Sequence, residues 1–214
     1  ILRPPRSTLF PYTTLFRSSE GHTGGSNVAI GEEITYALLV TLPEGTTPAN
    51  VTIVDALPVG LVYVPGSAAI DLTGFNGSVN AADPSVSCAG ACGSGDDLTF
   101  TFNNPIVVAS DNEETNNSFI LRFRALVFNE AGNQNGDVLN NAATLNVPGV
   151  TPITTPNVPA TIVEPELNLI KSVSDNTPGI NQTITFTLNL AHLPSSTANA
   201  QNVQLTDTPP TGLV

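Results

Sequence analysis

Residues 119–127 have the sequence FILRFRALV, in which two arginines alternate with apolar residues at the centre. Arg122 and Arg124 fall on one face of this stretch, and the other face is entirely apolar: Phe119, Leu121, Phe123, Ala125 and Val127. A period of two is that of a β-strand with one buried face. The stretch therefore predicts a strand in a sheet that packs against a second layer.

The same alternation occurs in residues 34–42 and 98–102. Turn signals rich in proline and glycine separate these runs. They are Pro43-Glu44-Gly45, Pro58-Val59-Gly60, Pro65-Gly66, Asn76-Gly77 and Asn135-Gly136. Strands of this spacing, with turns between them, predict an all-β fold of about eight strands in a two-sheet sandwich, without helices.

Composition supports the all-β prediction and excludes some functions. The 214 residues include 17 glycines and 18 prolines, lack Met and Trp, and are only 11% charged. The net charge of -12 would repel a phosphate backbone, which argues against nucleic acid as a partner. No apolar run approaches the roughly 18 residues of a membrane span, so we expect none in this fragment and place any export signal or anchor outside it.

The chain repeats itself, which bears on fold more than any single motif. The segment ITYAL at 34–38 recurs as ITFTL at 184–188. Residues 50–62 recur as 202–214, with identical residues at seven of thirteen positions. The spacing of 150 to 152 residues predicts sandwich repeats in tandem, the second one truncated.

The first eighteen residues are set apart from this pattern. Residues 4–18, PPRSTLFPYTTLFRS, resemble the conceptual translation of a sequencing adapter. We interpret residues 1–18 as an adapter-derived artefact and exclude them from the fold prediction. They hold three of the six basic residues, so the other 196 carry 3 basic and 18 acidic groups, a net charge of -15.

The repeat suggests the domain limits. We expect a first β-sandwich over 19–158, a proline-rich junction over 159–166 and the N-terminal part of a second repeat over 167–214. Five prolines lie between Pro148 and Pro165, which would keep the chain extended there. Residues 160–163 could still pair as an edge strand.

Three segments carry a family resemblance: GEEITY at 31–36, VDALPVGL at 54–61 and ELNLIKSV at 166–173. They resemble the DUF11 conserved repeat of large prokaryotic surface proteins and the isopeptide-forming domains of fimbrial proteins. The resemblance covers residues 27–64 and 160–214. It implies immunoglobulin-like beads in an extracellular, cell-surface adhesin or envelope protein, with a spacer or adhesive role.

Strand parity places polar residues on apolar faces. Lys171 shares a face with Leu167 and Leu169, and Asp207 one with Val203 and Leu205. In the first repeat, Asp55 and Asn141 stand on the apolar faces of residues 51–55 and 139–147. Such residues are rarely buried unless they are paired.

A lysine, an acid and an asparagine in one dry core are what an autocatalytic isopeptide bond needs. Here the first repeat would hold Asp55 and Asn141 without a lysine, and the second Lys171 and Asp207 without an asparagine. The simpler interpretation is that Lys171 extends to the rim of the sheet, both aspartates cap turns and Asn141 bonds backbone at an edge.

Other candidate sites are few. Two thiols cannot complete a zinc site, so Cys88 and Cys92 predict a small-loop disulfide, and with it an oxidising compartment, over two free thiols. Asp96, Asp97 and Asp111 offer oxygen ligands for calcium, but solvated acidic loops explain them as well. There is no nucleophile elbow and no phosphate-binding loop, and His22 and His192 lie in different repeats, so we expect neither an enzyme nor a cofactor.

Three function classes remain to be compared. The leading one is a structural spacer or stalk repeat whose partners are neighbouring repeats of the chain, with a host or cell-surface protein or glycan as possible further partners. The second is a carbohydrate- or protein-binding sandwich with its ligand site on the loops between 65 and 118. An aromatic-lined pocket there would favour it, whereas an enzyme would need a polar cluster inside a pocket.

Overall fold

The computed structural model describes residues 8–11, 23–200 and 203–212. The chain divides into two compact units, Ile1–Val163 and Glu164–Val214. Secondary structure in the described ranges consists of strands and one 3-10 turn, η1 (Glu114–Asn116). None of these described elements is a helix with the length and apolar character needed to cross a bilayer.

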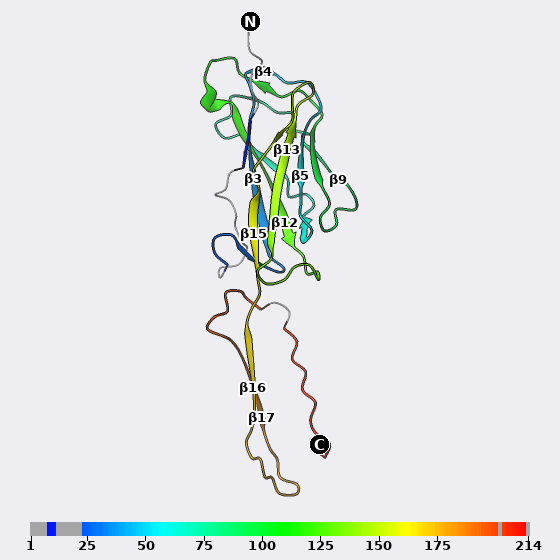
Figure 1. Cartoon of the computed structure of the whole chain (residues 1–214), viewed down its shortest axis with the longest axis vertical. Coiled ribbons are helices and arrows are strands. Elements are labelled where there is room, and N and C mark those ends of the chain that lie inside the picture. Colours follow the sequence, from blue (N-terminus) through cyan, green and yellow to red (C-terminus); the bar gives the residue numbers. More distant parts are fainter. Residues whose placement is uncertain (1–7, 12–22, 201–202, 213–214) are drawn as a thin grey trace. The chain divides into compact units, whose positions relative to one another are not determined.

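The first unit consists mainly of two antiparallel sheets (Figure 1). One sheet has the order β1 (Thr8–Pro11), β3 (Glu33–Thr41), β12 (Ser118–Val127) and β6 (Leu61–Tyr63), with β7 (Ala69–Asp71) also on β12. The other has the order β2 (Asn27–Ala29), β15 (Val158–Val163), β13 (Val138–Asn146), β5 (Val51–Ala56), β10 (Leu98–Phe102) and β9 (Ser85–Cys88). The short β14 (Ile153–Thr154) pairs with β13, and β2 with β15 is the one parallel pair among the described strands.

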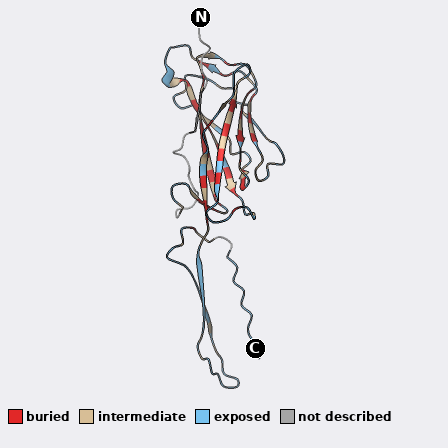
Figure 2. Ribbon diagram, viewed as in Figure 1, coloured by how far each residue is buried: buried red, intermediate tan, exposed pale blue. Residues whose placement is uncertain are grey.

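The core lies between the inner faces of these sheets. Along β12 every second residue is buried from Phe119 to Val127, and Arg122 and Arg124 point away, as the alternation predicts. Figure 2 shows the buried positions recurring along the strands of this unit. The ring of Phe123 contacts those of Tyr36 and Phe100, both with centroids 5.3 Å away. Burial of these large apolar side chains supplies the main driving force for folding.

The strand count exceeds the eight that the sequence predicts. A third small sheet joins β4 (Gly45–Thr46), β11 (Val107–Val108) and β8 (Gly77–Ser78), which lie in connections between the long strands. Two residues are too few to show a period of two. The alternation of apolar residues therefore predicts the long core strands and gives no signal for these short ones.

A glycine at the β5–β6 turn allows a close contact. Gly60 has φ +107°, and a Cβ there would lie 2.2 Å from Oδ1 of Asn133. The buried Asn133 amide donates to the carbonyl oxygens of Gly60 and Phe128, over 3.0 and 2.7 Å. Gly212, which the repeat aligns with Gly60, has φ +102°. The turn geometry thus recurs where the sequence repeats.

The second unit is a two-stranded hairpin of β16 (Leu167–Val173) and β17 (Phe186–His192), followed by extended chain. Nearly all residues of both strands are exposed, as Figure 2 shows. Its apolar residues include Leu169 and Ile170, which are 49% and 53% exposed. A two-stranded hairpin with open faces is only marginally stable in water.

The turns that precede β3 and β17 share their hydrogen bonds. The backbone N–H of Ala29 donates to the Glu32 side chain over 2.9 Å, and that of Gly179 donates to the Gln182 side chain over 2.8 Å. In both turns the fourth residue also donates its own N–H to the carbonyl of the first. The residue between them, Gly31 or Asn181, has positive φ. Different side chains therefore build one turn in the two copies.

The boundary between the units falls after Val163, inside the junction predicted over 159–166. Strand β15 pairs with β13 and, in parallel, with β2, so it belongs to the first sandwich despite Pro159. Residues 160–163 are thus in a paired strand, which lies between β13 and β2 and not at the edge of the sheet, and the first unit extends beyond the predicted limit of 158. The rest of the segment from Pro148 is mostly without regular structure, apart from β14.

Candidate functional site

A polar cluster lies in the dry core of the first unit. Asp55, on β5 between β13 and β10, is fully buried, with 0% of its surface exposed. Burial raises the pKa of Asp55 to about 7. The neighbouring Asn141 side chain lowers this pKa, and the negative charge of Asp97 raises it further. Among the described residues, neither Asp55 oxygen has a hydrogen-bond partner of normal geometry, although the Asn141 side chain lies close enough to influence its pKa. This carboxyl group is held where its charged form is costly.

Asn141 and Tyr36 complete this cluster. Asn141 is 3% exposed on β13, and its Oδ1 has no partner within the described part of the chain, nor has the hydroxyl of the 5% exposed Tyr36. Burial and the Asp55 charge both raise the pKa of the Tyr36 hydroxyl. Buried polar atoms without partners are rare in native folds, and each costs about 1–3 kcal/mol. Asp55, Asn141 and Tyr36 thus form a buried polar cluster in the core of the first unit.

In the second unit, a lysine contacts the residues that the repeat aligns with Asp55 and Tyr36. Nζ of Lys171 lies 2.5 Å from Oδ1 of Asp207 and 4.5 Å from the ring centroid of Phe186. The repeat aligns Asp207 with Asp55 and Phe186 with Tyr36. The side chains of Lys171 and Asp207 are 36% and 33% exposed. The sequence predicts Lys171 on a core face, but the described chain of this unit provides no second layer to bury it.

Strand register identifies the corresponding position in the first unit. Lys171 lies opposite Leu188 in the β16–β17 pair. Leu188 aligns with Leu38, whose partner across the β1–β3 pair is Pro11. Facing residues of an antiparallel pair share a face. Position 11 is therefore the position in the first unit that corresponds to Lys171, and it holds a proline from the segment that resembles an adapter.

The simpler interpretation of these residues is wrong for two of the four. Asp55 lies within β5, and neither of its oxygens bonds a turn in the described residues. Asn141 lies on an inner strand flanked by β15 and β5. Lys171 does keep contact with water, although it is paired with Asp207. The structure thus brings Asp55 together with Asn141, and Lys171 together with Asp207, in separate units.

Sequence reasoning missed the two aromatic members of the site. The alternation over 34–42 places Tyr36 on an apolar face and gives it no further role, and Phe186 stands out only as part of the repeated segment 184–188. The available signal was the tyrosine itself, because a hydroxyl on a core face needs a partner. In the second unit the ring of Phe186 lies under Lys171. Sequence periodicity alone cannot indicate such a contact.

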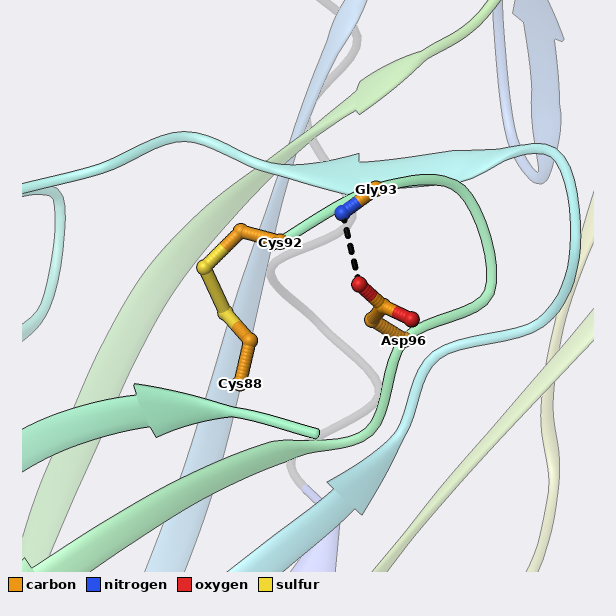
Figure 3. Close-up of a disulfide and its surroundings, with 4 residues drawn as sticks. All are labelled: Cys88, Cys92, Gly93 and Asp96. Carbon is orange, nitrogen blue, oxygen red and sulfur yellow. Dashed lines mark hydrogen bonds between the residues drawn. A yellow bond between two sulfur atoms is a disulfide. The ribbon is translucent and has the colours of Figure 1, made fainter. Parts of the chain in front are cut away.

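Cys88 and Cys92 form the predicted disulfide, with their Cα atoms 5.1 Å apart (Figure 3). The bridge closes a tight loop after β9. In the same loop the backbone N–H of Gly93 donates to Asp96 over 2.8 Å. This hydrogen bond gives the Asp96 carboxylate a structural role in the turn.

The other acidic candidates are also explained by local contacts. Asp111 accepts from the side-chain amides of Asn76 and Asn116, over 2.7 and 2.9 Å, which lowers its pKa. Asp97 is exposed. Within the described ranges, no three acidic, histidine or cysteine side chains gather in a way that could hold a metal ion. Calcium binding by Asp96, Asp97 and Asp111 stays a prediction without support from geometry.

A cavity of about 420 Å³ lies within the long loops between 65 and 118. Small and aliphatic residues dominate its lining, which runs over Ala68–Ile70, Leu72 and Val79–Pro84. No aromatic ring lines it, so it lacks the feature that would favour a carbohydrate-binding sandwich. Asp55, Tyr36 and Asn141 are not among its lining residues.

Comparison with solved structures defines the fold class. BcpA, the major pilin subunit of Bacillus cereus, matches with a TM-score of 0.50 and 12% identity over 87% of this chain and 55% of BcpA. A variant of BcpA matches with a TM-score of 0.51, again at 12% identity, over 87% of this chain and 56% of its own. The chain thus spans a little over half the length of these proteins.

The chain has an all-β, immunoglobulin-like sandwich fold, similar to that of the pilin subunit BcpA. No protein-family model and no curated protein matches its sequence. Membership of the DUF11 repeat family therefore remains a resemblance of the three segments at 31–36, 54–61 and 166–173.

Proposed function

We propose that this chain is part of an extracellular surface protein in which sandwich repeats in tandem act as spacer or stalk, each complete repeat closed by a Lys–Asn isopeptide bond. The observation that carries the proposal is the shared site: Asp55 beside Asn141 in one copy, Asp207 bonded to Lys171 in the other. The recurring turns at 29–32 and 179–182 support the tandem arrangement.

The buried cluster has the chemistry for this bond. Burial favours a protonated Asp55 and a neutral lysine, because both charged forms are costly in a dry core. The lysine Nζ attacks Cγ of Asn141 while the Asp55 carboxyl donates a hydrogen bond to the amide oxygen. The Nζ–Cγ bond forms and the Cγ–Nδ2 bond breaks. Asp55 passes a proton from Nζ to the leaving nitrogen, and one ammonia is released.

Such a bond would suit a load-bearing module. It would join the position of residue 11, on the first β-sheet strand, to Asn141 on β13, and would enclose most of the sandwich in one covalent loop. A pulling force would then pass through the bond instead of unfolding the strands between. An enzymatic role has less support, because Asp55, Tyr36 and Asn141 are at most 5% exposed and no substrate could reach them.

The experiment restores the missing lysine as Pro11→Lys in the full chain and stretches single molecules from both ends. We expect the variant to extend less than the parent chain, by the contour length of the segment between residues 11 and 141. The matched control is Pro11→Lys combined with Asn141→Ala, which keeps the lysine and removes the amide. Full extension of both variants would contradict the proposal.

A further inference from the structure

The loop between β9 and β10 bonds to both sheets at the end of β5 where Asp55 lies. Asp55 is the last residue but one of β5, which belongs to the same sheet as β9 and β10. Residues 88–97 are called the strap below. The backbone N–H of Gly95 in the strap donates to the carbonyl of Leu61 on β6, a strand of the other sheet, over 3.1 Å. The strap thus crosses from one sheet to the other beside the β5–β6 turn.

Two side-chain hydrogen bonds fix the same crossing. The hydroxyl of Ser94 accepts from the backbone N–H of Gly60 over 2.7 Å and donates to the Glu130 carboxylate over 2.7 Å. Gly60 belongs to the β5–β6 turn, and Glu130 follows β12 of the other sheet. A Cβ added at Gly95 would lie 2.8 Å from Cγ2 of Val59, so the strap packs tightly against this turn. These contacts hold the strap over the end of β5.

Strand register places the disulfide in the same row as Asp55. Cys88 lies opposite Leu98 in the β9–β10 pair, and Leu98 lies opposite Asp55 in the β10–β5 pair. Facing residues of paired strands share one side of the sheet, so Cys88 is on the core side, as Asp55 is. Cys88 and Cys92 both pack against the buried apolar cluster, and the bridge between them is drawn in Figure 3. The disulfide therefore holds the strap against the core, two strands away from Asp55.

The strap also brings a charge close to Asp55. Asp97, its last residue, directly precedes the residue opposite Asp55, and its carbonyl accepts from the N–H of Ala89 over 2.9 Å. The negative charge of Asp97 raises the pKa of Asp55, in addition to the larger effect of burial. On other elements, Asn141 of β13 and Tyr36 of β3 interact with Asp55, and both are uncharged at neutral pH. Among the described residues, Asp97 is thus the charged group that acts on Asp55.

We propose that the strap, closed by the Cys88–Cys92 disulfide, is a positioning element for the isopeptide reaction: it keeps water from the end of the core at Asp55 and holds Asp97 near that carboxyl. The reaction itself rests on the proposed function, but both effects act on Asp55 whether or not a lysine is present. Without the bridge the strap opens more often, and water then reaches Asp55. The carboxyl then ionises at lower pH, and an ionised Asp55 cannot donate a hydrogen bond to the Asn141 amide.

The first experiment follows Asp55 in the full chain, with proline at position 11. NMR of the aspartate carboxyl carbons from pH 4 to pH 9 gives the titration midpoint of Asp55, and Asp55→Asn assigns its signal. We expect a midpoint of about 7 in the parent chain. In Cys88→Ser with Cys92→Ser the midpoint should be lower by at least about one pH unit. Asp97→Asn should lower it by less, because this variant loses the charge and keeps the burial.

Two variants separate this effect from a general loss of stability. Ser94→Ala keeps the disulfide and removes two of the contacts of the strap, so it should also lower the midpoint of Asp55. Thr47→Val removes the hydrogen bond from the N–H of Ile106 to the Thr47 hydroxyl, ahead of the start of β5, and should destabilise the fold without moving the midpoint. An unchanged midpoint in both strap variants, or an equal shift in Thr47→Val, would overturn the proposal.

The second experiment measures the reaction in Pro11→Lys with and without the bridge. At pH 8 the protonated fraction of Asp55 falls about tenfold for each unit by which its midpoint falls. Loss of ammonia, followed by intact mass over time after refolding, should therefore be at least about tenfold slower without the bridge. Equal rates of ammonia loss in the two forms would count against the strap. If neither form loses ammonia, the isopeptide proposal fails, and the titration of Asp55 still decides whether the strap acts on this carboxyl.

Discussion

Replacing the buried acid, Asp55→Asn, should remove a pH dependence of stability that the core imposes. Burial raises the pKa of Asp55 from 3.8 to about 7. Between these values the folded chain holds a proton that the unfolded chain has lost, so the free energy of unfolding falls as pH rises. About 3 pKa units at about 1.4 kcal/mol each give a loss of about 4 kcal/mol between pH 4 and pH 7. Asparagine has the same shape and does not titrate.

Urea unfolding followed by circular dichroism, at steps from pH 4 to pH 8, measures this effect. The stability difference between Asp55→Asn and the parent chain should grow by about 4 kcal/mol in favour of the variant across that range. Asp83 and Asp111 have lowered pKa values, so their contribution changes below about pH 4 and is common to both proteins. The control Asp97→Asn, at an exposed neighbour, should give a much smaller change. A difference that stays constant with pH would refute the burial argument.

Three further predictions concern the scaffold. Gly60→Ala should destabilise the first unit by about 2–3 kcal/mol in chemical unfolding, because Gly60 has a positive φ and lies against Asn133. The control Gly132→Ala should be nearly neutral, because a Cβ there meets nothing within 4 Å. Equal effects would contradict a tight contact between Gly60 and Asn133. Cys88→Ser with Cys92→Ser should lower stability by at most about 2 kcal/mol and leave the circular dichroism spectrum intact, since the bridge spans a short loop. Loss of the fold would show a larger role. Glu32→Gln should be tolerated, because Gln182 makes the same hydrogen bond in its own turn. Glu32→Ala should cost about 1–2 kcal/mol of stability in the same assay. A larger loss for Glu32→Gln than for Glu32→Ala would argue against equivalent turns.

The alternating strands made the sandwich predictable from sequence. Residues 34–42, 98–102 and 119–127 each bury one face over enough positions to show the period, and the structure has β3, β10 and β12 there. The short β4, β8 and β11 give no such signal. β15 was harder to assign because Pro159 and nearby prolines suggest an open junction, whereas pairing with β13 and β2 decides its structure.

The site was only half predictable. Parity placed Asp55 and Asn141 on buried faces, but it could not show that they are adjacent in space or that their atoms lack partners. That depends on the register of β13 against β5, where Asp55 lies opposite Ala143. The role of Tyr36 depends on packing between sheets, for which a single strand carries no information. The disulfide, by contrast, followed from two cysteines four residues apart.

The intact mass of Pro11→Lys after folding tests most directly whether Asp55 and Asn141 form an isopeptide site that needs only a lysine at position 11. The account predicts the sequence mass less one ammonia, and the full mass when Asn141→Ala is added. An unmodified mass for Pro11→Lys in a chain that folds normally would contradict it.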